Sequence, residues 1–129
     1  MSHTIDFTTL EKVLYSVDNP AGGTSGSAIT LSDNIDNYDE VVVYYNIFYD
    51  YSQSTTRARV VKNGTTNVSC QGVYMDGTSG NVKMAQLRIT GNKLSFFGQG
   101  EYSFTTGNFV TGNRIRVSRV IGVIKQGTI

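Results

Sequence analysis

Aromatic and polar side chains that together could bind a sugar stand close to one another near residue 50. Tyr49, Asp50 and Tyr51 are followed by Gln53 and Arg57. Aromatic rings contact the apolar faces of sugars, while carboxylate, amide and guanidinium groups bond to sugar hydroxyls. The alternative is that the tyrosines pack at a strand end with their hydroxyls in water. We take these five residues as the candidate carbohydrate-binding site.

An acidic turn between residues 33 and 40 offers two other kinds of chemistry. Its candidate calcium ligands are Asp33, Asn34, Asp36 and Asp39, although the glycine and the distant glutamate of the EF-hand loop are missing. Paired carboxylates also cleave glycans, and the turn carries four carboxylates, on Asp33, Asp36, Asp39 and Glu40. Outside the turn, Asp50 with Glu101 would form such a pair if the fold brings these distant segments into one cleft. Neighbouring acids in a turn are more often solvated or capping groups, so we expect no metal site.

Other catalytic residues are scarce. His3 is the only histidine and lies in a start without pattern, which leaves almost no material for a histidine-based triad or a zinc site. Cys70 is the only cysteine, so an internal disulfide is excluded, and we expect Cys70 to be a small buried residue. We therefore predict no catalytic residue, no cofactor and no metal, and a protein that is not an enzyme.

The charges are unevenly distributed along the chain. Residues 1–50 carry one lysine against eight acidic residues, while residues 51–129 carry ten basic residues against Asp76 and Glu101. We expect the two parts to attract each other within one fold, the alternative being a bipolar surface that meets a neighbouring copy. Five arginines could contact nucleic acid, namely Arg57, Arg59, Arg114, Arg116 and Arg119. With a net charge of +1 and no basic run, a solvated strand face is favoured and no nucleic-acid partner is expected.

The elements that must position these residues are predicted to be strands. The 129 residues include 14 Gly, 8 Tyr and 6 Phe but one Pro, and short β-prone segments alternate with turn signals such as Asn63-Gly64, the loop 76–80 and Gly91-Asn92. This pattern predicts one all-β domain, an antiparallel β-sandwich or jelly roll. We assign residues 1–27 to an N-terminal segment with an edge strand and a Gly-rich linker, and residues 28–129 to the β-sandwich domain.

The densest apolar run lies at residues 40–51 and is predicted to be one long strand, followed by a polar bend at YSQST. Ser32 is the predicted cap of the turn before it. Apolar side chains occupy both faces of this strand, which is typical of a strand inside a sheet stack or at a subunit boundary. Val43, Tyr45 and Ile47 are therefore our candidate residues for an oligomer interface.

Two stretches resemble a known group of proteins. ITLSDNIDNYDEVVVYY (Ile29 to Tyr45) is a strand, an acidic turn with I-x-N-Y and a second strand, and RVSRVIGVIK (Arg116 to Lys125) is a closing strand with a basic residue, an apolar pair and a glycine. Both resemble the C-terminal domains of bacteriophage tail fibres, tailspikes and minor tail proteins. Such domains usually follow a long shaft, whereas only the residues before Ile29 precede the motif here. We therefore expect an excised domain or a small protein that attaches to a larger assembly.

The resemblance implies a β-sandwich module at the tip of a virion tail, made in the host cytoplasm. It implies a homotrimer that contacts other virion tail proteins and binds bacterial surface polysaccharide. A purely structural trimerisation or capping module is the alternative, and a glycan-cleaving enzyme is a third possibility. No apolar run approaches the roughly 18 residues of a membrane span, so no membrane insertion is expected.

Overall fold

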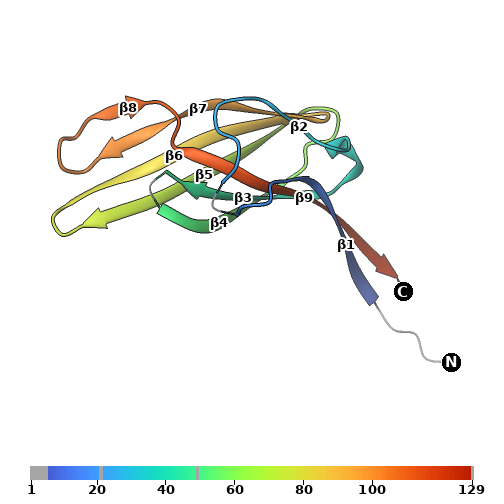
Figure 1. The fold of residues 1–129 in the computed structure, drawn as a ribbon. Coiled ribbons are helices and arrows are strands. Elements are labelled where there is room, and N and C mark those ends of the chain that lie inside the picture. Colours follow the sequence, from blue (N-terminus) through green and yellow to red (C-terminus); the bar gives the residue numbers. More distant parts are fainter. Residues whose placement is uncertain (1–5, 21, 49, 129) are drawn as a thin grey trace.

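The protein is a sandwich of two antiparallel sheets (Figure 1). The computed structural model describes residues 6–20, 22–48 and 50–128, and the side chains of 10–20, 22–48 and 53–125. Sheet A has the order β1 (Asp6–Ser16), β9 (Ile115–Thr128), β3 (Glu40–Ile47) and β4 (Asp50–Arg59). Sheet B has the order β2 (Ile29–Thr30), β7 (Lys93–Ser103), β6 (Ser79–Thr90) and β5 (Thr65–Asp76), and β8 (Phe109–Thr111) also pairs with β7. The predicted all-β antiparallel sandwich is confirmed.

The core lies between the two sheets because alternate side chains of β3, β5, β6 and β9 point inward. Val43, Tyr45 and Ile47 of β3 belong to this core and are 0%, 4% and 6% exposed. The single chain therefore covers these side chains itself. They are not available for the oligomer interface to which we assigned them, because periodicity shows that a strand face is covered but not by which chain.

The opposite face of β3 is also apolar, and its partners lie on the same sheet. Val42 packs with Ile121 and Val123 of β9, and the half-buried Tyr44 borders this group. The pattern of apolar residues on both faces thus comes from a main core on one side of sheet A and a small cluster on its outer side. A second subunit is not required to explain it.

The predicted strand over residues 40–51 is in fact two strands. β3 ends at Ile47, the chain reverses, and β4 begins at Asp50, which pairs with Ile47. The YSQST segment, which we expected to bend, lies within β4. The reversal was missed because Phe48, which lies in the turn, is not a turn-forming residue type.

The segment after β4 differs from the prediction as well. Asn63-Gly64 was expected to close a hairpin, but it lies on the connection from β4 in sheet A to β5 in sheet B. Asn63 does take the left-handed conformation that the dipeptide suggests, with φ of 57°. The short 3-10 helix η1 (Ile35–Asn37) is capped by Asn34, not by Ser32.

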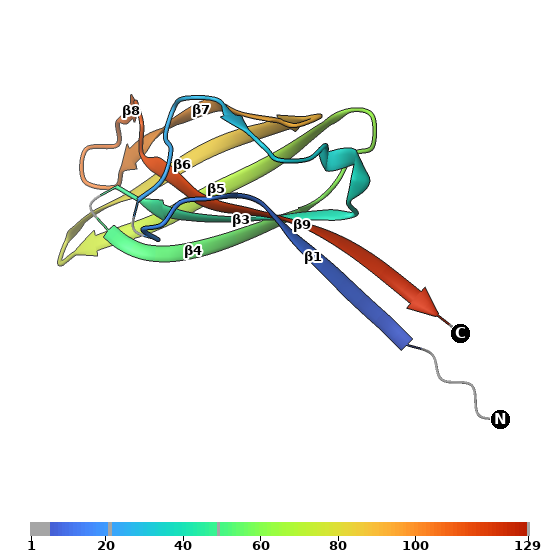
Figure 2. The same cartoon turned by 45° about the vertical axis from the view of Figure 1, so that its right-hand side comes forward.

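The N-terminal segment is part of the sandwich. β1 pairs with β9 from Asp6 opposite Thr128 to Ser16 opposite Arg119, and Leu14 is buried in the core. The expected boundary at residue 27 is therefore not a boundary between structural units. In Figures 1 and 2 the outer halves of β1 and β9 extend beyond the body of the sandwich, and both termini lie at that end. Within the described residues, no helix has the length and apolar character needed to cross a membrane.

Candidate functional site

A cleft of about 290 Å³ lies where the core of the sandwich ends, and we call it the end cleft. It is lined by Phe48, Tyr74, Asn81, Lys83 and Glu101. These residues come from the β3–β4 turn and from strands β5, β6 and β7. In Figures 1 and 2 the β3–β4 and β5–β6 turns lie at the end of the sandwich opposite the two termini.

The alternation of β6 explains why polar side chains line the end cleft. Lys83 shares its phase with the core residues Ala85, Leu87 and Ile89, so its side chain points between the sheets. The core stops near Ile47, whose side chain packs against the backbone of Gly72. Beyond that point the same inward-facing positions carry polar groups.

Strand pairing brings the lining residues together in two cross-strand pairs. Tyr74 of β5 stands opposite Asn81 of β6, and Lys83 of β6 stands opposite Glu101 of β7. Side chains directly opposite each other on antiparallel strands lie about 5 Å apart at Cβ. The register of sheet B therefore fixes an aromatic ring, an amide, an ammonium and a carboxylate in one small area.

Each of the two described aromatic rings that line the end cleft has a cation beside it. The Nζ of Lys83 lies 5.7 Å from the centre of the Tyr74 ring, and the guanidinium of Arg116 lies 4.4 Å from the centre of the Phe48 ring. Such contacts fix the orientation of a ring, because the cation is attracted to the negative face of the ring. Glu101 accepts a hydrogen bond from Nε of Arg114 at 2.5 Å, which holds its carboxylate at the wall of the cleft.

This arrangement suits binding of a polar ring compound. Tyr74 is 46% exposed, so part of its ring is open to a ligand. Asn81, Lys83 and Glu101 offer both hydrogen-bond donors and acceptors next to that ring. A sugar needs this combination, because it has an apolar face and a rim of hydroxyls.

The structure does not bring all of the predicted sugar-binding residues to the end cleft. Tyr49 lies outside the described residues, as do the side chains of Asp50 and Tyr51. Gln53 lines a separate groove of about 360 Å³ beside the loop that follows β1. Arg57 is exposed, and its Nη1 pairs with a carboxylate oxygen of Glu40 at 3.5 Å.

The groove beside Gln53 is polar and is lined by Ser16, Val17, Asp18, Pro20, Gln53, Ser118 and Arg119. Gln53 is held there by a hydrogen bond from its Nε2 to Oγ of Ser118, at 3.1 Å. The guanidinium of Arg119 lies 5.9 Å from the centre of the Tyr44 ring. This groove is a second polar depression, but the described residues that line it include no aromatic side chain.

Sequence reasoning did not single out Tyr74, Asn81 or Lys83. One signal was present for Lys83, because it is a charged residue in the same alternation phase as three apolar residues of β6. A charge on the apolar face of a strand is uncommon and indicates either a partner or a site. Glu101 was considered only as an acid to be paired with Asp50, and the side chain of Asp50 lies outside the described part of the chain.

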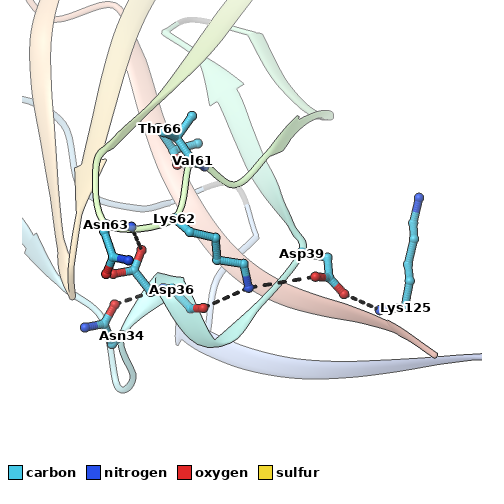
Figure 3. A network of polar contacts seen from close by, with 8 residues as sticks. All are labelled: Asn34, Asp36, Asp39, Val61, Lys62, Asn63, Thr66 and Lys125. Atoms are coloured by element: carbon cyan, nitrogen blue, oxygen red, sulfur yellow. Dashed lines mark hydrogen bonds and ion pairs between the residues drawn. The ribbon is translucent and has the colours of Figure 1, made fainter.

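The acidic turn forms hydrogen bonds and ion pairs with other segments of the same chain (Figure 3). Oδ1 of Asp36 accepts a hydrogen bond from the N–H of Asn63 at 3.0 Å, and the Nζ of Lys62 donates to the carbonyl of Asp36 at 2.8 Å. Oδ2 of Asp39 accepts from the N–H of Lys125 at 2.8 Å. These contacts join the turn to the β4–β5 connection and to β9.

Asp33 is also engaged, and its contacts are internal to the turn. Its carboxylate accepts hydrogen bonds from the hydroxyl of Tyr38 at 2.7 Å, from Nδ2 of Asn37 at 2.9 Å and from the N–H of Asn34 at 2.8 Å. The bond from Tyr38, above all, lowers the pKa of Asp33. Burial, with the bond to Asp33, raises the pKa of Tyr38 to about 12.

These bonds make the acidic turn a structural connection. The side-chain oxygen atoms of the candidate calcium ligands accept hydrogen bonds from groups of the protein itself. The described residues contain no group of three or more His, Cys, Asp or Glu that could hold a metal ion. Ion pairs join Asp39 to Lys62 and Glu40 to Arg57 and Lys125. The acidic first part and the basic second part thus attract each other within one fold, as we expected from the charge distribution.

No protein-family model matches the chain, and no curated protein matches it. The function must therefore be argued from the end cleft and its surroundings.

Proposed function

We propose that the chain is a tip module of a bacteriophage tail and that it binds carbohydrate on the host surface through the end cleft. The observation that supports this proposal most is the set of residues in the cleft: two aromatic rings beside an amide, an ammonium and a carboxylate. Tyr74 and Asn81 line the cleft beside the β5–β6 turn, and this turn lies at the end of the sandwich opposite both termini (Figure 1). A module attached to the rest of a tail near its termini would point the cleft away from the virion.

The proposed binding mode uses the open part of the Tyr74 ring as a platform for the apolar face of a sugar. Asn81, Lys83 and Glu101 then bond to hydroxyls at the edge of the sugar ring. This role requires no proton transfer, and we propose that the protein is not an enzyme. Release of reducing ends from a bound polysaccharide would instead favour the glycan-cleaving alternative.

We also propose that the module is a homotrimer in the virion tail. Five apolar side chains on β5, on β8 and in the turn before β8 are more than half exposed: Val73, Met75, Phe104, Phe109 and Val110. Exposed apolar groups gathered in one half of a sheet are typical of a protein contact surface. Light scattering should give the mass of three chains, and a monomer at micromolar concentration would count against the trimer.

The exposed apolar surface also favours the second candidate function, a purely structural module that trimerises or caps a tail protein. The two functions differ in a simple way. A structural module forms the trimer and ignores glycans, whereas a receptor-binding module does both. A glycan-binding assay on the purified chain therefore separates them.

The experiment that tests the proposed function is retention of the chain on immobilised bacterial surface polysaccharides. Tyr74→Ala removes the exposed ring and should weaken retention about tenfold. The matched control is Phe97→Ala, which removes a ring that is 62% exposed and stacks on Arg88 outside the cleft. Equal retention of both variants, or retention on no polysaccharide, would contradict the proposal.

A further inference from the structure

Among the described residues that line the end cleft, Lys83 has the most enclosed charge. Lys83 is only 5% exposed, although it lines the cleft. Its Nζ donates a hydrogen bond to Oδ1 of Asn81 at 2.8 Å and lies 5.7 Å from the centre of the Tyr74 ring. Among the side chains that the structure describes, no carboxylate pairs with it within 4.0 Å.

An enclosed ammonium in this setting is costly. It carries three N–H donors, and one of them is used on a described side chain. Removing a cation from water without a nearby anion costs several kcal/mol, and the attraction to an anion grows as water is excluded. A ligand that brings its own negative charge to Nζ would offset that cost.

The natural counter-ion of Lys83 is directed elsewhere. Glu101 stands directly opposite Lys83 in the pairing of β6 with β7. Its Oε1 accepts a hydrogen bond from Nε of Arg114, so the one carboxylate among the described lining residues is paired with an arginine. Arg116, beside the Phe48 ring, adds another positive charge at the same end of the sandwich.

From these contacts we infer that the end cleft selects an acidic sugar, whose carboxylate or phosphate group binds the ammonium of Lys83 while its ring lies against Tyr74. This inference rests on the proposed function and specifies its ligand class. Uronic acids and phosphorylated sugars share the chemistry, and the test below distinguishes them.

The test measures binding of D-glucuronate, glucose 6-phosphate and glucose to the full chain by NMR titration. The wild type should bind at least one acidic probe about tenfold or more tightly than glucose, and added salt should reduce that preference. Lys83→Met should bind all three probes equally weakly. The control is Lys93→Met, at an exposed lysine whose Nζ bonds to Thr30, and it should behave as the wild type.

The outcomes separate this inference from the proposed function. If the wild type binds glucose as well as it binds both acidic probes, or if Lys83→Met keeps the preference, the inference is overturned and carbohydrate binding stands. If the wild type binds no probe and no polysaccharide, both fail. Should Lys83→Met not fold, the wild-type side-chain NMR signal of Lys83 decides: it should shift with the preferred acidic probe and not with glucose, and an unchanged signal overturns the inference.

Discussion

The ring of Tyr38 lies directly against Gly122, so closely that a Cβ on residue 122 would be 2.6 Å from Cγ of the tyrosine. Tyr38 ends the I-x-N-Y turn, and Gly122 is the glycine of the closing strand β9. The two stretches on which we based the expected resemblance to tail-protein domains thus contact each other in the fold. The glycine leaves room for the ring, which gives a physical reason for a glycine at this position of β9.

Replacing Gly122 with alanine should destabilise the protein, because the added methyl group has no space beneath the Tyr38 ring. We expect the free energy of unfolding to fall by about 1–3 kcal/mol, the usual cost of overpacking. Urea denaturation measures the change. Gly98→Ala is the matched control, since a Cβ there meets nothing within 4 Å; equal stability of the two variants would contradict the account.

A second prediction concerns the contact between the sheets at Tyr45. Its hydroxyl donates to the carbonyl of Gln71 at 2.7 Å and accepts from the N–H of the same residue at 3.1 Å. Because β5 is an edge strand of sheet B, these backbone groups have no neighbouring strand on that side. Tyr45→Phe should lower the free energy of unfolding by about 1–2 kcal/mol.

The control for Tyr45→Phe is Tyr44→Phe, which changes the neighbouring tyrosine on the other face of β3. Tyr44 is half-buried and borders the outer cluster. Its variant should unfold within about 0.5 kcal/mol of the wild type. If both variants lose the same stability, the bond to the β5 edge contributes nothing specific.

Cys70 should be inert in the folded protein. It is 1% exposed, as the sequence led us to expect, and burial raises the pKa of its thiol to about 12. The reactive thiolate is therefore rare at neutral pH. A thiol reagent should react with the native chain at least about a hundredfold more slowly than with the chain in denaturing urea, and comparable rates would show that the core around Cys70 opens readily.

Stability should fall in acid, partly through Asp33. Because the folded pKa of this carboxyl lies below its ordinary value, its contribution is present above that value and is lost as the pH falls through the folded pKa. Tyr38→Phe removes the main donor but keeps the ring. The variant should be less stable than the wild type at about pH 5, and the gap should shrink at about pH 2.5.

Glu40 does not confuse that comparison. The pKa of Glu40 is also lowered, first by the hydrogen bond from Lys125. Because Tyr38→Phe leaves Glu40 and its partners in place, Glu40 contributes equally to the stability of the variant and of the wild type. Urea denaturation at the two pH values measures the gap. A difference in stability that stays constant with pH would mean that Tyr38 does not act through Asp33.

Much of the fold could be predicted because local chemistry determines it. Gly91 has φ of 61° and Gly77 has φ of 62°, and these are the conformations that make glycine a turn signal at the β6–β7 and β5–β6 turns. The reversal between Ile47 and Asp50 has no such residue within it. The joining of β1 to β9 depends on contacts between the two ends of the chain, which no local pattern reveals.

The candidate site was harder to predict than the fold. We searched for residues that are close in sequence, near residue 50, whereas the end cleft is assembled across strands. Tyr74 stands opposite Asn81, and Lys83 stands opposite Glu101, only because of the register of sheet B. A one-residue change of register would turn these side chains to the opposite face, so the site follows from the pairing and not from sequence proximity.

The most direct test of carbohydrate binding at the end cleft is an NMR titration that follows the backbone amides. The ligand is an oligosaccharide prepared from a surface polysaccharide that retains the chain. Changes should concentrate at Phe48, at residues 74–83 and at Glu101. Changes around the groove that contains Gln53 and Arg119, or no changes at saturating oligosaccharide, would contradict the proposed site.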